Sequence, residues 1–280
     1  RFQEIKSTIK TLLLFMCDMH SGSPVALFPD KQMQLKSCNH SPTELQRIIH
    51  RQFVEVCDTV RASRNGARVV VINLGDAIEG LHHGTKQVIS PYLTDQKKIH
   101  VELMNDLGNR IGGWDKLFYI DGTPAHAGEE EFDIAKDLGA EMCGESSTWP
   151  ELRAMVDGSN KLLWTAHHGT AAGNELGRGN ALRNRLRNIY FETLAENKPQ
   201  PDLVVYADRH EHRHEVFEGR PGLEIHGFLA PAWKVKDGYT YKVASLSDPN
   251  VGALVITVDN NAVDHKFLTL EVEQDRTVTI

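Results

Sequence analysis

Seven side chains that could bind a metal or move a proton lie at or just beyond the ends of apolar runs. In chain order they are Asp18, His20, Asp76, His126, His167, His210 and His212. Imidazole nitrogens and carboxylate oxygens, with no thiolate among them, suit zinc, manganese or iron. All of these side chains except His126 count as ligands, which is too many for one ion and enough for two. A pair of ions about 3.5–4 Å apart can clamp the attacking and leaving oxygens of a phosphoryl displacement.

The stretch YADRHEHRH, residues 206–214, places three histidines on alternate positions. In an extended chain alternate side chains point to the same face, so His210, His212 and His214 would point one way. Taken alone, this stretch is better explained as a solvated strand end with chance histidines than as a metal site. The positions of the other acids and histidines decide between these two explanations.

The apolar runs before these side chains predict β-strands. They lie at residues 11–17, 67–74, 116–120, 161–166 and 202–206. The turn DGSN joins the fourth run to a hairpin partner at 152–156. From residue 213 onward the pattern is almost all strand, at residues 213–219, 223–230, 238–244, 252–259 and 265–273.

Helical patterns separate the strands in the first two-thirds of the chain. The first helix has Ser41 as its predicted cap, Pro42 in its first turn and Glu44 closing a capping box. Further helices are predicted at about residues 90–110, 129–142 and 174–196. Strands alternating with helices, followed by a strand-rich end, predict an α/β core with two sheets in a single domain over residues 1–280. In open α/β folds ligands bind at the carboxyl ends of the strands, where the acids and histidines would converge.

Composition narrows the class of protein. With 280 residues, 40% hydrophobic and 25% charged, the chain is typical of a soluble globular protein. A net charge of −7 argues against broad nonspecific binding to nucleic acid or acidic membranes, although a local basic patch remains compatible with nucleic acid. No apolar run approaches the roughly 20 residues that span a bilayer, so no membrane partner is expected. The cysteines show no paired spacing, which predicts reduced thiols and a cytoplasmic protein.

The ordered set of motifs resembles the calcineurin-like metallophosphoesterase superfamily, whose members carry D-x-H, G-D, G-N-H, a later single His and G-H-x-H. The resemblance covers residues 11 to 214, approximately. It implies a four-layer α-β-β-α sandwich of two mixed sheets, with two divalent transition metals (Mn, Fe or Zn) at the strand ends. The implied ligands are Asp18, His20 and His212 for the first metal, His167 and His210 for the second, and Asp76 as a bridge.

The resemblance also implies two catalytic positions. His126 would be the acid that protonates the leaving oxygen. Glu79 falls where phosphatases of the family have an Asp that orients this histidine. A glutamate at a helix start, without a role in the chemistry, is an equal alternative for Glu79.

Two motifs depart from the family pattern. GTPAH stands in place of G-N-H, with two extra residues and no asparagine, so Thr123 or water would replace an amide ligand. Arg209 replaces the glycine of G-H-x-H, and its guanidinium could bind a phosphate oxygen of the substrate or pair with Asp208. In the HHG motif, His167 is the preferred ligand because it comes first after the strand, and His168 is the alternative.

These features predict an enzyme, a metal-dependent phosphoesterase in which a metal-bridging hydroxide attacks phosphorus. The alternative is a non-catalytic binding scaffold on the same fold, but such scaffolds usually lose ligands that persist here. A phosphodiester in a nucleic acid or nucleotide is preferred as substrate over a phosphomonoester of a small molecule or phosphoprotein. The reason is an arginine-rich stretch of the last predicted helix that contains no acids, although a plain solvated helix face explains this stretch slightly better. Its arginines are Arg178, Arg183, Arg185 and Arg187.

Overall fold

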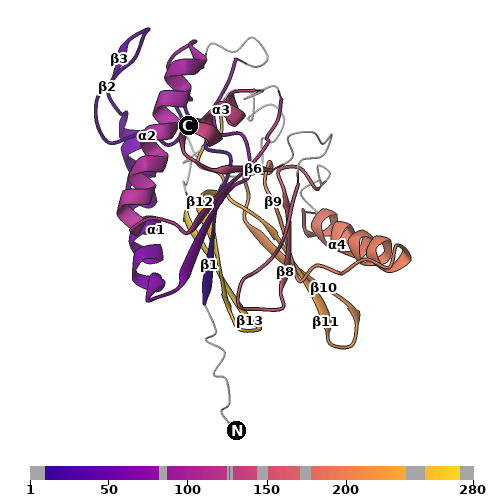
Figure 1. Ribbon diagram of the computed structural model, residues 1–280. Helices are drawn as coiled ribbons and strands as arrows, with labels where there is room; N and C mark the ends of the chain where they lie inside the picture. Colours follow the sequence, from indigo (N-terminus) through magenta and orange to yellow (C-terminus); the bar gives the residue numbers. More distant parts are fainter. Residues whose placement is uncertain are drawn as a thin grey trace, which may run out of the picture.

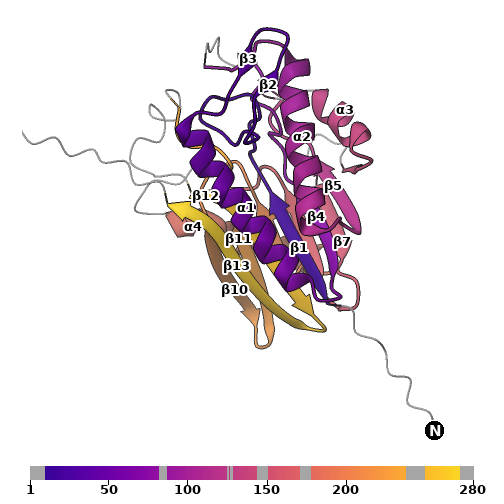
Figure 2. The same cartoon turned by 90° about the vertical axis from the view of Figure 1, so that its left-hand side faces the viewer.

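Two mixed β-sheets lie face to face, and helices cover the outer face of each (Figures 1 and 2). The computed structural model describes residues 10–81, 87–124, 126, 129–143, 151–170, 178–237 and 250–271. In spatial order, the first sheet consists of β13 (Ala262–Glu271), β12 (Asn250–Asp259), β1 (Thr11–Met16), β4 (Arg68–Asn73), β5 (Lys116–Ile120) and β6 (Glu141–Cys143). The second consists of β10 (Arg213–Arg220), β11 (Leu223–Leu229), β9 (Leu203–Tyr206), β8 (Leu162–Ala166) and β7 (Glu151–Met155).

Each sheet combines parallel and antiparallel neighbours. In the first sheet β1, β4, β5 and β6 run parallel, and β12 and β13 continue it in antiparallel pairs. In the second sheet β8, β9 and β11 run parallel, with β7 and β10 as antiparallel edge strands. Because β12 and β13 come last among the described strands, the end of the chain completes the sheet that β1 begins.

β1 shows why the apolar runs become strands. Its sequence TLLLFM is buried at every position. Leu12 and Leu14 pack in the core beneath the helices, whereas Leu13 and Phe15 pack in the core between the sheets. A strand covered on both faces has no solvent side, so its hydrophobic residues do not alternate with polar ones.

The helices form the two outer layers of the molecule. α1 (Glu44–Arg64), α2 (Leu93–Ile111) and α3 (Glu130–Asp137) lie over the first sheet, and α4 (Arg178–Ala195) lies over the second (Figures 1 and 2). Leu182, Leu186 and Ile189 of α4 pack against the second sheet in a third hydrophobic core. The described residues therefore form the four-layer α-β-β-α sandwich of two mixed sheets that was expected from the sequence.

Two predicted helix ends differ from the structure. Thr43, and not Ser41, caps α1, because its Oγ1 accepts the backbone N–H of Gln46 at 3.2 Å while the Gln46 side chain accepts the backbone N–H of Thr43 at 3.0 Å. Pro42 thus precedes the cap instead of opening the helix. α3 ends at Asp137 and not near 142, because Gly139 adopts a φ of 65° and residues 141–143 pair with β5 as β6.

Most of the remaining predicted elements are present. The hairpin around DGSN is confirmed, since β7 pairs with β8 in antiparallel register. The loop after β1 contains a short ladder of β2 (Met33–Gln34) and β3 (Asn39–His40). The predicted strand 238–244 and the predicted helix start at 174 lie outside the described residues. None of the described helices has the length and apolar character needed to cross a bilayer.

Candidate metal centre

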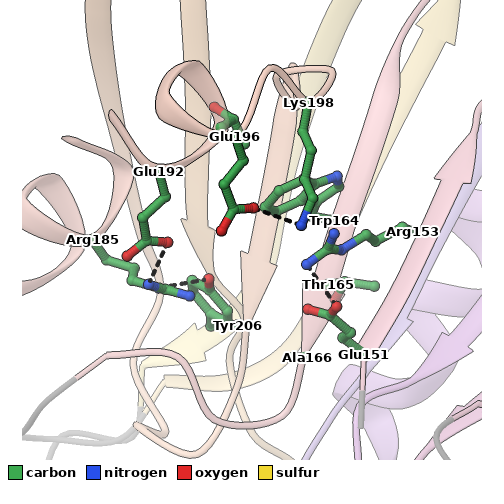
Figure 3. Close-up of a pocket in the computed structure, with 11 residues that line it drawn as sticks. Glu151, Arg153, Trp164, Thr165, Ala166, Arg185, Glu192, Glu196, Lys198 and Tyr206 are labelled. Carbon is green, nitrogen blue, oxygen red and sulfur yellow. Dashed lines mark hydrogen bonds and ion pairs between the residues drawn. The ribbon is translucent and has the colours of Figure 1, made fainter. Parts of the chain in front are cut away.

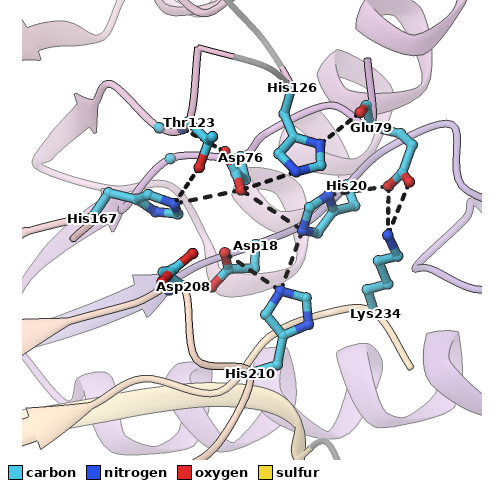
Figure 4. Close-up of polar contacts among 12 residues, drawn as sticks. Asp18, His20, Asp76, Glu79, Thr123, His126, His167, Asp208, His210 and Lys234 are labelled. Atoms are coloured by element: carbon cyan, nitrogen blue, oxygen red, sulfur yellow. Dashed lines mark hydrogen bonds and ion pairs between the residues drawn. The ribbon is translucent and has the colours of Figure 1, made fainter. Parts of the chain in front are cut away.

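Candidate ligands follow the ends of four strands and meet at one edge of the two sheets (Figure 4). Asp18 and His20 follow β1, Asp76 follows β4, His167 follows β8 and His210 follows β9. The φ angles of Asp18, His20, Asp76 and His210 are 48°, 43°, 49° and 52°. Non-glycine residues adopt positive φ rarely, and such strain is often found at functional sites. Here the positive φ angles turn the chain at the strand ends so that these side chains face one another.

Asp18, His20 and His210 form the first group of candidate ligands. Nε2 of His20 lies 3.3 Å from Nε2 of His210, and Oδ1 of Asp18 lies 3.7 Å from the same His210 nitrogen. Asp18 and His20 are buried, and Oδ1 of Asp18 has no hydrogen-bond partner among the described residues. When two imidazoles bind one tetrahedral ion through metal–nitrogen bonds of about 2.0–2.1 Å, their ligating nitrogens lie about 3.3 Å apart. These three residues therefore fit a transition metal.

Asp76 and His167 are the centre of a second group. Nε2 of His167 lies 3.4 Å from Oδ2 of Asp76, while Nδ1 of His167 donates to the backbone carbonyl oxygen of Leu74 at 2.5 Å. The Leu74 contact makes Nδ1 the protonated nitrogen and leaves Nε2 able to bind a metal. Oδ2 of Asp76 also lies 3.9 Å from Nε2 of His20, so Asp76 stands between the two groups.

His168 and Asp208 extend the second group toward solvent. Nδ1 of His168 lies 3.6 Å from Oδ2 of Asp208, and together with His167 they form a set whose ligand atoms could share one ion. Oγ1 of Thr123 lies 3.4 Å from Nε2 of His167 and 3.2 Å from Nε2 of His168. A hydroxyl therefore lies beside this group in the motif that lacks the family's asparagine.

His212, expected as a ligand of the first metal, belongs to neither group. Its ring stacks on Phe267 with the ring centroids 4.8 Å apart, and its Nδ1 lies 3.3 Å from Oγ1 of Thr269. Both partners belong to β13. The imidazole of His212 thus packs against the edge strand of the first sheet.

The turn after β9 explains this difference from the sequence interpretation. β9 ends at Tyr206, so Asp208 and His210 occupy the first alternate positions beyond the strand, whereas His212 directly precedes β10. The structure therefore brings Asp208 and His210 to the centre, in place of His210 and His212. The rule that favoured His167, the first ligand-type residue after a strand, would have found Asp208 as well.

His126 and Glu79, the predicted catalytic residues, both reach the centre (Figure 4). Nε2 of His126 lies 3.8 Å from Oδ2 of Asp76, and its Nδ1 donates to the backbone carbonyl oxygen of Glu79 at 2.8 Å. The Glu79 carboxylate contacts Nδ1 of His20 at 3.1 Å and the ammonium of Lys234 at 2.9 and 3.0 Å. Glu79 thus contacts His126 through its main chain, and its carboxylate faces His20.

Glu131 and Lys234 reach the centre from segments that the sequence motifs do not include. Glu131, buried on α3, accepts the backbone N–H groups of Ala77 and Gly122, each at 2.7 Å. It thereby ties the loop after β4 to the loop after β5. Burial, with the nearby carboxylate of Asp76, raises the pKa of Glu131 to about 8. No spacing marks either residue, because Glu131 lies 54 positions from Ala77 and Lys234 lies 155 positions from Glu79.

The charges of the centre are buried and close together. Burial raises the pKa of Asp18 to about 8 and lowers the pKa of His210 to about 3, which favours the neutral imidazole that binds metals. Burial also opposes ionisation of Asp76, but His167 and His20 outweigh it and hold the pKa of this carboxyl below its ordinary value. Divalent cations would neutralise such a set of buried carboxylates.

The arginines of α4 differ in their contacts. Arg183 pairs with Glu215 at 2.6 Å, and Arg185 pairs with Glu192 at 3.6 Å. Arg187 forms no ion pair with a described residue. A stretch that lacks acids in the sequence is therefore partly neutralised by acids elsewhere in the fold. The side chain of the fourth arginine, Arg178, lies outside the described part of the structure.

A cavity of about 220 Å³ lies between the second sheet and α4, apart from the centre (Figure 3). Its charged side chains contact neighbouring residues, as in the pair of Arg185 with Glu192 and in Arg153, which lies 3.9 Å from the ring centre of Trp164. The residues that line it include none of the candidate metal ligands.

The sequence matches no protein-family model and no curated protein. Solved structures with a similar course of the chain include sulfate thiohydrolase SoxB of Thermus thermophilus, at 13% identity and a TM-score of 0.41, covering 96% of this chain and 58% of that one. Vacuolar Protein Sorting 29 of Cryptosporidium parvum matches at 10% identity and a TM-score of 0.38, covering 94% of this chain and 100% of that one. A predicted phosphoesterase of Streptococcus pneumoniae matches at 10% identity and a TM-score of 0.36, covering 94% of this chain and 92% of that one.

These likenesses are too distant to assign an activity to the chain. The chain combines the four-layer fold implied by its resemblance to the calcineurin-like metallophosphoesterase superfamily with a buried cluster of aspartates and histidines at one edge of its sheets.

Proposed function

We propose that this chain is a hydrolase of phosphoesters that depends on two divalent cations. One observation carries the proposal: Asp76 stands between a buried group of ligands and a second group around His167. Two cations held there would lower the pKa of a water molecule and offset the charge of the phosphoryl group in the transition state. Manganese, zinc and iron all suit a mixture of carboxylates and imidazoles.

The proposed ligand sets follow the geometry. They are Asp18, His20 and His210 for the first cation and Asp76, His167 and Asp208 for the second. Asp18 also lies within reach of the atoms of Asp76 and His167, and Asp76 lies 3.9 Å from His20, so we propose Asp76 as a ligand of both cations. Compared with the set implied by the sequence resemblance, His210 takes the place of His212, and Asp208 takes the place of His210. His168 and Thr123 lie beside the second set, where either can add a ligand atom.

His126 is the proposed proton donor to the leaving oxygen. Its Nδ1–H is bonded to the Glu79 carbonyl, so Nε2 is the nitrogen that faces Asp76 and the centre. General-acid help of this kind typically contributes about 10²–10⁴ in rate. Glu79 has a positioning role in this scheme, since its carbonyl fixes the ring of His126.

A phosphodiester of a nucleic acid or nucleotide is the substrate that we favour. Arg209 lies between Asp208 and His210 in the chain and forms no ion pair with a described residue. We propose that its guanidinium binds a phosphate oxygen of the substrate, a contact that positions a strand without reading its sequence. The four cysteines are free thiols, which suits an enzyme of the cytoplasm.

An activity panel with Mn²⁺ tests the proposal. It compares a phosphomonoester, an aryl phosphodiester, nucleotides, and single- and double-stranded DNA. We expect cation-dependent hydrolysis, faster on the diesters than on the monoester. Faster hydrolysis of the monoester would support the proposed phosphoesterase activity but refute the proposed preference for a diester substrate. No hydrolysis by metal-loaded protein on any substrate would favour a non-catalytic scaffold.

Asp76→Ala tests whether two cations share this residue. Elemental analysis should find close to two ions in the wild-type chain and both positions depleted in the variant, because Asp76 faces both groups. Asp58→Ala, exposed on α1, is the control and should retain both ions. Full retention of metal by Asp76→Ala would contradict the shared ligand.

A further inference from the structure

Lys234 is a buried cation beside the candidate metal centre that no sequence motif includes. Its side chain is 3% exposed. Its ammonium donates to both carboxylate oxygens of Glu79, at 2.9 and 3.0 Å, and lies 2.8 Å from Oδ2 of Asp237. Lys234 is therefore held between two carboxylates, and these contacts fix the position of its ammonium.

Glu79, the partner of Lys234, touches both histidines on its side of the centre (Figure 4). Its Oε2 lies 3.1 Å from Nδ1 of His20, within ion-pair distance but without the alignment of a hydrogen bond, and its carbonyl oxygen accepts Nδ1–H of His126 at 2.8 Å. A carboxylate beside one ring nitrogen of a histidine helps to set the ring orientation in which the other nitrogen faces a metal. In His20 the other nitrogen is Nε2, which faces His210 and Asp76.

The backbone around Lys234 is bonded directly to the loop that carries Asp18 and His20. The N–H of Trp233 donates to the carbonyl oxygen of Asp18 at 3.1 Å, and the N–H of Val235 donates to the carbonyl oxygen of Val25 at 3.0 Å. Trp233 is fully buried. The ammonium of Lys234 is therefore held at a set place relative to the candidate ligands, because its main chain is fixed on both sides.

We propose that Lys234 is a positioning residue for the first metal. It holds the Glu79 carboxylate beside Nδ1 of His20, and this contact sets the ring orientation in which Nε2 of His20 faces the cation. The inference rests on the proposed function, since it requires a cation at the group of Asp18, His20 and His210. Lys234 touches neither that cation nor the substrate, and its effect passes through Glu79.

Lys234→Met is the direct test, because methionine keeps an unbranched chain and removes the charge and its three donors. Lys161→Met is the matched control, since Lys161 forms an ion pair with Asp202 at 2.9 Å just before β8, at the other end of that strand from His167. The measurements are metal content after dialysis and Mn²⁺ binding by calorimetry. Electron paramagnetic resonance then shows whether the bound Mn²⁺ ions are a coupled pair or isolated.

We expect the wild-type chain and Lys161→Met to bind two ions as a coupled pair. In Lys234→Met the first ion should bind about 10–100-fold more weakly, the range found when an outer partner of a metal-bound histidine is removed. The second ion should bind as before, so that its spectrum becomes that of an isolated ion. Lys234→Arg, which restores a charged donor to Glu79, should recover part of the affinity for the first ion.

The outcomes separate this inference from the proposed function. If wild-type protein binds no cation and hydrolyses no phosphoester, the proposed function is refuted and this inference with it. If wild-type and Lys234→Met bind two ions equally well, only the role of Lys234 is refuted. If Lys234→Met loses its tertiary circular dichroism, the double variant Lys234→Met/Glu79→Gln, which removes both charges, replaces it. Wild-type affinity for the first ion in that double variant would also overturn the inference.

Discussion

Gly122, at the end of β5, is the position where a single methyl group should disturb the metal centre most directly. A Cβ built there would lie 2.5 Å from Oδ1 of Asp76 and closer still to the Asp76 backbone nitrogen. Gly122 does not have a positive φ, so alanine can adopt its backbone conformation. Any effect of Gly122→Ala must therefore come from the contact with Asp76 and not from backbone strain.

The size of the effect follows from the distances. Ordinary contact begins at 3.4 Å, so the Asp76 backbone nitrogen, at 2.2 Å, and its Oδ1, at 2.5 Å, must each move by about 1 Å. Overpacking of this kind typically costs about 1–3 kcal/mol of the free energy of unfolding. A displacement of about 1 Å at a reacting centre can cost about 10²-fold in rate. Because Asp76 faces both ligand groups, both cations should bind more weakly.

Urea unfolding, calorimetric metal binding and steady-state kinetics on an aryl phosphodiester measure these effects. Gly113→Ala is the matched control: its φ is 84° and no atom lies within 4 Å of the added Cβ. It should lose about 1–2 kcal/mol of stability through its backbone conformation alone and keep both cations. If Gly122→Ala binds both cations as tightly as wild type, the close approach of the two loops does not position Asp76.

Three further predictions concern the acid, the arginines and a buried histidine. His126→Ala should retain its metals and lose about 10²–10⁴ in rate on esters with poor leaving groups, with a smaller loss on a nitrophenyl ester; equal losses on both would indicate a binding role. Arg187→Ala should lower the slope of DNA binding against salt by about one, whereas Arg183→Ala, whose guanidinium already pairs with Glu215, should change it less. Burial lowers the pKa of His100 to about 4, against an ordinary value of about 6.5. Because the folded chain favours the neutral imidazole, the free energy of unfolding should be unaffected by His100 above pH 6.5 and should fall by up to about 3 kcal/mol as the pH decreases from 6.5 toward 4. Urea unfolding of chelator-treated protein across this range should show a loss that is smaller in His100→Gln than in wild type by up to about 3 kcal/mol, the remainder coming from other buried histidines such as His210.

The strands could be predicted well because burial on both faces leaves a continuous apolar signal. β1 and β4 carry no charged residue within their buried positions, and the polar residues that follow them mark their ends. Asp18, His20, Asp76 and His167 lie together in the structure for the same reason. Each follows such a strand within a few residues, where the chain can turn toward the edge of the sheet.

The helix ends, and which side chains after β9 face the candidate centre, were predicted less well, because they depend on choices between near-equivalent neighbours. Thr43 and Ser41 are both good caps, and only the side chain of Gln46 decides between them. His210 and His212 both carry imidazoles, and they would share a face if the chain were extended through this stretch. The positive φ of Asp208 and His210, at 68° and 52°, breaks that extension and sends His212 toward β13.

By itself the sequence determined the layered α/β architecture and the edge where the acids and histidines gather, because both follow from the order of short segments along the chain. Only the tertiary structure decided which residues hold that edge together. Glu131 reaches Ala77 and Gly122, and Lys234 reaches Glu79 across 155 positions of the chain. Contacts of this kind leave no local spacing in a sequence, since they depend on how separate segments are brought together when the core forms.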